Sequence, residues 1–230
     1  MKLPTDTSPA ASSDVPAPRR VFLRRATALS ATALLGACGL DLPGQGPPPR
    51  LFRLTPKNTF APDLPTVDWQ LIIEQLLAPT GLNTGRIALH RRAVELEYYA
   101  RANWTDRAPA MIQTLVVESF ENSGKILAVG RESLGLRADF VLKLELREFQ
   151  AEYGDTGQPE AHVRINAKLV RMPQRAIIGS RRFEARVPAS ADNMDDIVVA
   201  FDDALGKALK NLVGWTLTTG EAARPDRRQG

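Results

Sequence analysis

The sequence predicts an α+β fold in which two main helices pack on one face of a mostly antiparallel sheet. Several segments alternate apolar and polar residues with a period of two, which is typical of half-buried strands. Two other segments, near residues 105–123 and 190–215, repeat apolar residues at helical spacing, as amphipathic helices do. Glycine, proline and asparagine separate these segments. The elements therefore follow one another as strands, a helix, longer strands and a final helix.

Short strands are predicted before the first helix, in residues 50–56, 67–77, 86–90 and 93–100. In the second of these strands, alternation places Trp69, Leu71 and Ile73 on one face and Ile72 on the other. The third and fourth strands are joined by a short polar turn at residues 90–92, so we expect them to form a β-hairpin.

The first helix is predicted from its start and stop signals. Thr105 or Asp106 is a candidate N-cap, and Pro109 suits the first helical turn. Gly124 is expected to end the helix, because glycine readily adopts the left-handed conformation of a C-cap. Residues 125–129 then form a short strand.

Longer strands are predicted in residues 138–153, 160–170 and 175–187. In the first of them, Phe140, Leu142 and Leu144 face one way and charged residues face the other. This pattern predicts an antiparallel strand with one solvated face. In the last of them, Ile177 is expected to share the inward face with Phe183.

The final helix has a candidate N-cap at Ser190, Asp192 or Asn193, and we expect it to end near Trp215. We assign residues 50–219 to one α+β domain and residues 220–230 to a polar tail. A chain of this length is long enough to bury a substantial core.

Residues 1–37 have the pattern of an export signal. Arginines at positions 19, 20, 24 and 25 precede a short apolar run. This run is shorter than the ~20 apolar residues that a transmembrane helix needs. Its end, Leu35-Gly36-Ala37-Cys38, resembles the lipobox of bacterial lipoproteins. The resemblance implies cleavage between Ala37 and Cys38, and a diacylglycerol and an N-acyl chain such as palmitate on Cys38. The alternative is a plain secretory signal followed by an ordinary buried cysteine.

A second export motif overlaps this signal. Arg19, Arg20, Phe22 and Leu23 resemble the twin-arginine motif, which an export receptor recognises. The alternative is general secretory export, in which the arginines supply only positive charge. Residues 38–49 are rich in proline and glycine and are expected to form a flexible tether.

The residue after Cys38 bears on the destination of the protein. It is glycine rather than aspartate. By resemblance to lipoprotein sorting in enterobacteria-like species, this favours the outer membrane, with the folded part facing the periplasm.

The charge of the chain does not indicate a nucleic-acid partner. The formal net charge is +4, but residues 1–37 hold five basic and two acidic residues. The remaining chain therefore carries 25 basic and 24 acidic residues. Such a balance produces no basic field that would attract nucleic acid.

We find no motif of a catalytic or metal site. The single cysteine is assigned to lipidation, and His90 and His162 have no partner at ligand spacing. No glycine-rich phosphate loop precedes a helix, so the chain is not expected to be an ATPase. We therefore expect no enzymatic activity and no cofactor other than the covalent lipid.

The order of several segments resembles the ABC-type transport auxiliary lipoproteins, the family that includes paraquat-inducible lipoprotein C. The segments are the lipobox with its proline-rich tether, Arg86-Ile87 followed by residues 94–99, Asn103-Trp104, residues 123–126, residues 138–142 and the final helix. The resemblance covers residues 50–216. It implies a periplasmic, non-enzymatic auxiliary component of an ABC system that moves lipids between the inner and outer membranes.

The resemblance also implies partners. These are a protein with a mammalian-cell-entry domain and the ABC permease and ATPase, besides the membrane that holds the anchor. The alternatives are an outer-membrane assembly or structural interaction lipoprotein unrelated to ABC transport, and an anchored hydrolase, for which the sequence offers no site. The number of copies is left open, including a homo-oligomer.

Tyr98, Tyr99 and Trp104 form an aromatic cluster before the first helix. They are candidates for a partner contact, because aromatic side chains often anchor interfaces. The alternative is that they complete the core. Arginines near the last hairpin are candidates for contact with anionic headgroups or an acidic partner, or for a solvated strand face. They are Arg171, Arg175, Arg181, Arg182 and Arg186.

Overall fold

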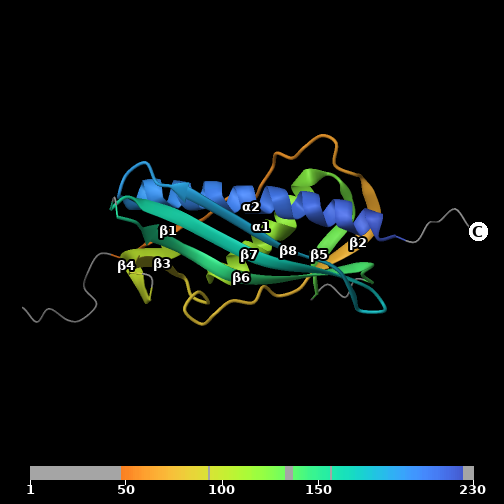
Figure 1. Ribbon diagram of the computed structural model, residues 1–230, viewed down its shortest axis with the longest axis horizontal. Coiled ribbons are helices and arrows are strands. Elements are labelled where there is room, and N and C mark those ends of the chain that lie inside the picture. Colours follow the sequence, from red (N-terminus) through yellow and green to blue (C-terminus); the bar gives the residue numbers. More distant parts are fainter. Residues whose placement is uncertain (1–47, 93, 133–136, 156, 225–230) are drawn as a thin grey trace, which may run out of the picture. The chain divides into compact units, whose positions relative to one another are not determined.

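The computed structural model describes residues 48–92, 94–132, 137–155 and 157–224. These residues form an eight-stranded sheet and two α-helices, which confirms the predicted α+β class (Figure 1). The strands are β1 (Arg50–Phe52), β2 (Val67–Ile73), β3 (Arg86–Arg92), β4 (Glu95–Trp104), β5 (Ile126–Arg131), β6 (Phe140–Tyr153), β7 (Pro159–Arg171) and β8 (Ala176–Pro188). The helices are α1 (Ala108–Ser123) and α2 (Met194–Ala222). Neither helix in this part of the chain combines the length and hydrophobicity that crossing a bilayer requires.

The sheet is mixed, so the prediction of a mostly antiparallel sheet is wrong. Among the described strands, the pairings β1–β4, β2–β5, β2–β6 and β3–β6 are parallel. The pairings β3–β4, β6–β7 and β7–β8 are antiparallel, and the first of these is the predicted hairpin. Alternation identifies which residues face the core, but not the direction of the neighbouring strand. Parallel pairing needs a long crossover, and the segment from β3 to α1 provides one between β2 and β5.

Strand β6 lies at the centre of the sheet. Along one edge it pairs first with β2, where Leu71 lies opposite Phe140, and later with β3, where Ala88 lies opposite Gln150. Between these two pairings, a parallel bridge joins Leu77 to β6. Strand β7 pairs with the other edge of β6 from end to end. The chain from β2 to β3 therefore lies along one edge of β6 over most of the length of that strand.

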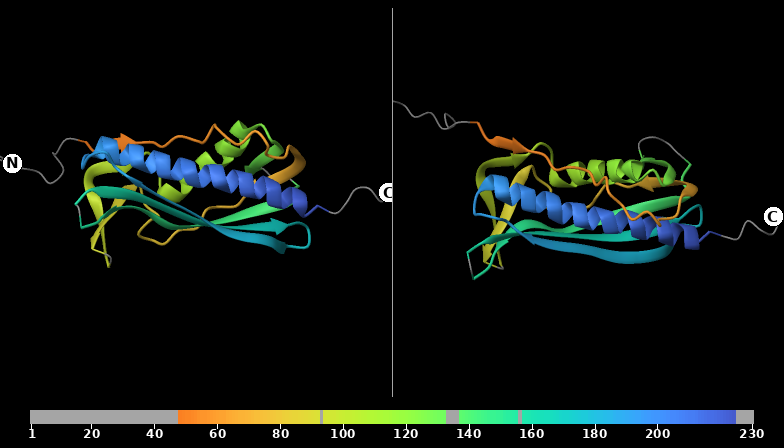
Figure 2. Two further views of the ribbon diagram at one scale, coloured as in Figure 1. Left: turned by 45° about the horizontal axis from the view of Figure 1, so that its top comes forward. Right: turned by 90° about the horizontal axis from the view of Figure 1, so that it is seen from above.

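Helices α1 and α2 cover one face of the sheet. Figure 2 shows α2 running along the β7–β8 hairpin with α1 beside it. Trp215 of α2 packs against Phe183 of β8, with ring centroids 5.6 Å apart. Near the end of α2, Gly220 packs on the indole of Trp69, whose Nε1 atom donates to Glu221 at 3.2 Å. The hydrophobic core lies between the helices and this face, and the opposite face of the sheet points away from both helices.

The ends of α1 follow the sequence signals only in part. Arg107 immediately precedes α1 and no side chain caps this end, so the predicted cap at Thr105 or Asp106 is wrong. Asp106 instead accepts a hydrogen bond from the backbone N–H of Arg107 at 2.6 Å, one residue before the helix. Gly124 has a φ of 60°, which confirms the predicted left-handed end.

Helix α2 begins at a predicted cap but ends later than predicted. The Oδ1 atom of Asn193 accepts hydrogen bonds from the backbone N–H groups of Asp195 and Asp196, both at 3.1 Å. The predicted end near Trp215 is wrong, because the apolar face of the helix continues and Leu217 is fully buried. The boundary predicted between the domain and the polar tail falls inside this helix.

A register shift in the β7–β8 hairpin turns one isoleucine away from its predicted face. Leu169 lies opposite Gly179, and Val170 lies opposite Ile177. Ile178 is therefore an extra residue on β8, as in a β-bulge. Ile178 packs against the core, whereas Ile177 is 60% exposed. The prediction that Ile177 faces inward is wrong.

Candidate functional site

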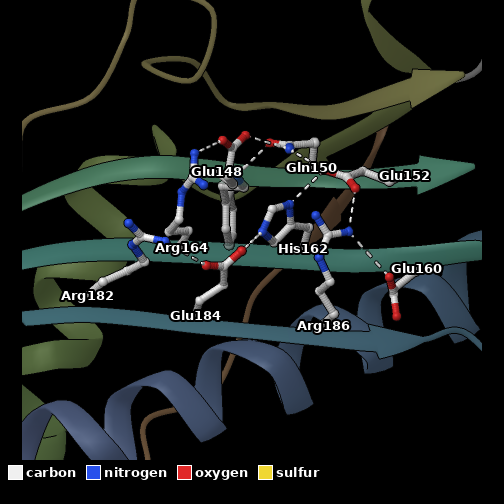
Figure 3. A network of polar contacts seen from close by, with 10 residues as sticks. Glu148, Gln150, Glu152, Glu160, His162, Arg164, Arg182, Glu184 and Arg186 are labelled. Carbon is white, nitrogen blue, oxygen red and sulfur yellow. Dashed lines mark hydrogen bonds and ion pairs between the residues drawn. The ribbon is translucent and has the colours of Figure 1, made fainter. Parts of the chain in front are cut away.

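The sheet face that points away from the helices carries a network of charged side chains. Alternation along β7 sends Ala161 into the core and sends His162 and Arg164 to this face. Strand register places Gln150 of β6 and Arg186 of β8 on either side of His162. Figure 3 shows the resulting cluster, which spans three neighbouring strands.

His162 is the buried centre of this network, with 3% of its surface exposed. Its Nδ1 atom lies 2.6 Å from the Oε1 atom of Glu152, and its Nε2 atom lies 2.7 Å from the Oε1 atom of Glu184. An ionised carboxylate only accepts hydrogen bonds, so a ring with protons on both nitrogens satisfies both contacts. The hydrogen bond from His162 lowers the pKa of the Glu184 carboxyl below its usual value.

Glu152 accepts hydrogen bonds from several side chains. Besides His162, Arg186 donates to it at 2.5 Å and the Nε2 atom of Gln150 donates at 2.9 Å. Burial by itself raises the pKa of Glu152, but the hydrogen bonds from Arg186, His162 and Gln150 outweigh this effect and hold the pKa at about 2. This carboxylate is therefore ionised at neutral pH.

Glu148 extends the network along β6. It forms an ion pair with Arg164 of β7 and accepts a hydrogen bond from Gln150 at 2.8 Å. Gln150 is buried, and its side-chain oxygen accepts from the backbone N–H of Phe149 at 2.7 Å. The amide of Gln150 thus bridges Glu148 and Glu152 and leaves none of its own polar atoms without a partner.

Glu148, Glu152 and His162 are the described residues that a metal ion could use. One ligand atom from each lies within 4.8 Å of the other two. These atoms are already engaged, because an arginine faces each carboxylate and a carboxylate faces each ring nitrogen. A metal ion would have to replace these contacts and would meet the positive charges of Arg164 and Arg186. The geometry fits an ion-pair network that ties β6, β7 and β8 together better than it fits a metal centre.

Sequence reasoning missed this network. Ligand spacing along the chain does not reveal the network, because the partners of His162, Glu152 and Glu184, lie on the strands before and after it. The available signal was the alternation of charged residues on three successive strands. That signal becomes informative only when the register of the strands is known.

A groove lies further along the same sheet face, where β6 begins and β7 ends. We call it the open-face groove, and its volume is about 720 Å³. Its apolar floor is formed by Ile72, Ala138, Val141, Val170, Met172 and Ile177. Its charged lining is formed by Glu74, Glu132, Arg137, Lys143, Lys168 and Arg175. A concave apolar surface with a few charged groups is the usual form of a ligand site.

The aromatic residues predicted as a partner contact do not share one surface. Trp104 is 2% exposed and packs in the core with Phe149 and Phe201, at ring-centroid distances of 5.4 and 5.3 Å. It therefore completes the core rather than presenting a surface. Tyr98 and Tyr99 are half-buried, and their contact with a partner stays a prediction.

The two tyrosines are held by their hydroxyl groups. The hydroxyl of Tyr98 donates to the backbone carbonyl of Gly81 at 3.0 Å. The hydroxyl of Tyr99 lies 3.0 Å from that of Tyr153, which in turn donates to Asp192 at 2.7 Å. Burial, together with this hydroxyl pair, raises the pKa of Tyr99 well above its ordinary value. Tyr99 is therefore a neutral structural contact at neutral pH.

The arginines near the last hairpin differ in their surroundings. Most of them are engaged within the chain by a carboxylate, a backbone carbonyl or an aromatic ring, and these are Arg171, Arg181, Arg182 and Arg186. Arg175 instead lines the open-face groove and forms no ion pair with any residue that the structure describes.

The predicted lipidation and export residues lie outside the described part of the chain. They are Arg19, Arg20, Phe22, Leu23, Ala37 and Cys38. Their roles stay predictions from the sequence.

Comparison with known proteins places the chain in a family. The sequence matches the ABC-type transport auxiliary lipoprotein component family over residues 52–213. The crystal structure of protein XCC0632 from Xanthomonas campestris, a DUF330 protein, is similar to this chain at 34% sequence identity and a TM-score of 0.72. The alignment covers 75% of this chain and 97% of that one.

Two further proteins are similar to this chain. Another crystal structure matches with a TM-score of 0.58 at 16% identity, over 73% of this chain and 97% of that one, which shows a shared fold alone. The protein bll6063 of Bradyrhizobium diazoefficiens is 28% identical over 168 residues, which is 71% of this chain. The match covers only 43% of that protein, so this chain spans less than half of its length. Because the family match covers most of the chain, and the Xanthomonas protein shares both sequence and fold, the chain belongs to the ABC-type transport auxiliary lipoprotein component family.

Proposed function

We propose that this protein is a non-enzymatic, lipid-anchored periplasmic component of an ABC-type system that moves lipids between the inner and outer membranes. The observation that carries the proposal is the family match over residues 52–213. The Xanthomonas relative supports it, because its fold is shared along 97% of its own length. The word auxiliary in the family description fits a subunit that assists a transporter and does not itself hydrolyse ATP.

A non-enzymatic role agrees with the chemistry of the sheet face. In the described residues, the carboxylates gathered around His162 form ion pairs with arginines and hydrogen bonds with the imidazole. A general base or nucleophile needs a pKa matched to its task and room for a substrate. Glu152 has a pKa of about 2, so it is a weak base at neutral pH.

The anchor that we propose is lipid on Cys38. Two or three acyl chains would hold the protein firmly, since one chain alone gives only marginal membrane binding. The outer membrane is the proposed site of anchoring, because Gly39 follows the lipidated cysteine. The proposed export route is the twin-arginine pathway.

The proposed partners are a protein with a mammalian-cell-entry domain and the ABC permease and ATPase. The test is purification of the full-length protein, tagged at its C-terminus, from membranes after mild cross-linking, followed by mass spectrometry. We expect recovery of a mammalian-cell-entry protein above the level obtained with an unrelated lipoprotein carrying the same tag. Repeated recovery of outer-membrane assembly proteins in its place would contradict the proposal and support the alternative of an assembly lipoprotein.

A further inference from the structure

An apolar row crosses the face of the sheet that points away from the helices. Strand register places Ile72 of β2 opposite Val141 of β6, and Val141 opposite Val170 of β7. The next pairing extends the row to Ile177 of β8. Ile72, Val141 and Val170 form a hydrophobic cluster separate from the main core. Ile72, Val141 and Val170 are only 5%, 9% and 4% exposed, so they form the floor beneath the groove, whereas Ile177 is 60% exposed beside them. A strand face outside the main core usually carries polar residues, so an apolar groove floor there indicates a binding surface.

The row beside it carries like charges. Lys143 of β6 lies directly opposite Lys168 of β7, an arrangement that destabilises an antiparallel pair. Glu74 forms an ion pair with Lys143, with the Nζ and Oε2 atoms 2.6 Å apart, and so compensates the charge of this lysine. Within the described part of the chain, no carboxylate pairs with Lys168, and the same holds for Arg137 and Arg175. Among the described residues, the groove therefore holds more positive than negative charge.

This lining favours an anionic amphiphile over a peptide. Strands β2, β6 and β7, which carry most of the floor, are paired along both edges, so they offer no row of free backbone groups to bind a peptide main chain, and among the described strands at the groove only the outer edge of β8 is unpaired. The remaining means of recognition are apolar contact and charge. The charged lining, Glu132 included, has four cationic and two anionic side chains, and this surplus attracts an anion. The volume of the open-face groove, about 720 Å³, lies in the range of small-ligand sites.

We infer that the open-face groove binds the headgroup and the adjoining part of one acyl chain of an anionic phospholipid, because a volume of about 720 Å³ is too small for a whole lipid with two long chains. The acyl part lies against Ile177 and over the apolar floor, and the phosphate group lies at Lys168 and Arg175. The choice of a lipid as the ligand rests on the proposed function. The position of the site rests on the residues that line the groove. The site gives this subunit a direct part in holding the transported lipid.

The first test reverses the charge at the proposed phosphate position. The full-length protein, purified in a non-ionic detergent, is titrated with fluorescent phosphatidylglycerol, and binding is followed by fluorescence anisotropy. Phosphatidylcholine with the same acyl chains is the zwitterionic comparison. The double variant Lys168→Glu/Arg175→Glu is expected to lower the affinity for phosphatidylglycerol about tenfold or more. The matched control, Lys207→Glu/Lys210→Glu on the exposed side of α2, should leave that affinity unchanged.

The second test changes the exposed apolar residue of the row and keeps Lys168 and Arg175 in place. Ile177→Glu is expected to weaken phosphatidylglycerol binding about tenfold, because a carboxylate replaces an acyl contact and repels the phosphate. Ile177 is 60% exposed, so this substitution leaves the core intact. The matched control is Val199→Glu on α2, where the valine is 61% exposed and lies outside the groove. Circular dichroism confirms that both variants fold.

Several outcomes would overturn the inference. They are equal binding of phosphatidylglycerol and phosphatidylcholine, equal effects of the groove variants and their controls, and displacement of the lipid by a polyglutamate peptide that binds more tightly. The last outcome would assign the groove to an acidic protein segment. Capture of the mammalian-cell-entry protein is measured separately with the same variants. Capture without lipid binding refutes only the lipid site, and lipid binding without capture refutes only the proposed partnership.

Discussion

The Nδ1 atom of His162 lies 2.6 Å from the Oε1 atom of Glu152, at a point where the ring is almost closed to solvent. The second ring nitrogen contacts Glu184 on β8. Strands β6 and β8 are both neighbours of β7 and do not pair with each other. One imidazole therefore links two strands that share no backbone hydrogen bonds, and we expect it to contribute to the stability of the long three-stranded part of the sheet.

His162→Ala should destabilise the protein by about 2–3 kcal/mol, because two hydrogen bonds to ionised carboxylates are lost from a buried position. The measurement is the free energy of unfolding in urea. His90→Ala is the comparison variant and should change it less, because His90 lies opposite Glu152 in the β3–β6 pairing but forms no hydrogen bond or ion pair with the described residues of the network. Equal urea midpoints for the two variants would show that the network does not hold the strands together.

Acid should weaken this network through Glu152. The pKa of this carboxyl is about 2 in the folded protein, below its usual value of 4.5. Because the folded state has the lower pKa, the stabilisation is fully present above the usual value and is lost as the pH falls toward 2. Glu152→Gln removes this contribution, so the stability of the variant should fall less than that of the wild type over this pH range. Glu132→Gln, at an exposed carboxyl, should keep the wild-type pH dependence.

Gly220 should not tolerate a side chain, because a Cβ atom there would lie 2.6 Å from the Cζ2 atom of Trp69. The indole has little room to move, since it packs edge-on against Phe140 with centroids 4.9 Å apart. Gly220→Ala is therefore expected to cost about 1–3 kcal/mol and to lower the melting temperature. Gly206→Ala in the same helix would meet only Lys57 at 3.8 Å, so it should stabilise by up to about 1 kcal/mol. A higher melting temperature for both variants would refute the close packing at Trp69.

Replacing Cys38 by Ala should abolish labelling of the protein with radioactive palmitate and release it into the soluble periplasmic fraction. The reason is that the thiol is the proposed attachment point of the diacylglycerol. The measurement is autoradiography after membrane fractionation, with the unlabelled membrane proteins as a loading control. A variant that still sediments with membranes would place the anchor elsewhere.

Replacing both Arg19 and Arg20 by Lys should block export, because the twin-arginine receptor distinguishes arginine from lysine although both carry positive charge. The readout is accumulation of the uncleaved precursor in a pulse-chase experiment. Replacing Arg24 and Arg25 by Lys is the matched control and should leave processing intact. Normal processing of the first variant would indicate the general secretory route.

The burial pattern of the strands could be predicted from local alternation. Leu142 and Leu144 face the core as expected, because the side-chain period of a strand is a local property. Alternation fails at Ile177, where one extra residue in β8 exchanges the two faces. A bulge depends on the partner strand, so a single strand read in isolation does not contain it.

The pairing of distant segments could not be predicted in the same way. The backbone of Gln70 is hydrogen-bonded to Asp139, which is 69 residues away. Strands β2 and β6 pair in parallel, and neither segment alone indicates this direction. The open-face groove is another consequence of register, since Lys143 and Lys168 read separately as ordinary solvated lysines.

The contact between Trp69 and Glu221 joins positions 152 residues apart, and so it bears on how the domain forms during synthesis. Trp69 of β2 is covered only after the last turns of α2 have formed. Contacts of such long range slow folding and couple the two halves of a chain. A chain without these turns lacks part of the helix that completes its core, so we expect the domain to fold as one unit. Export factors would meet either an unfolded chain or a complete domain, with no stable half-domain between them.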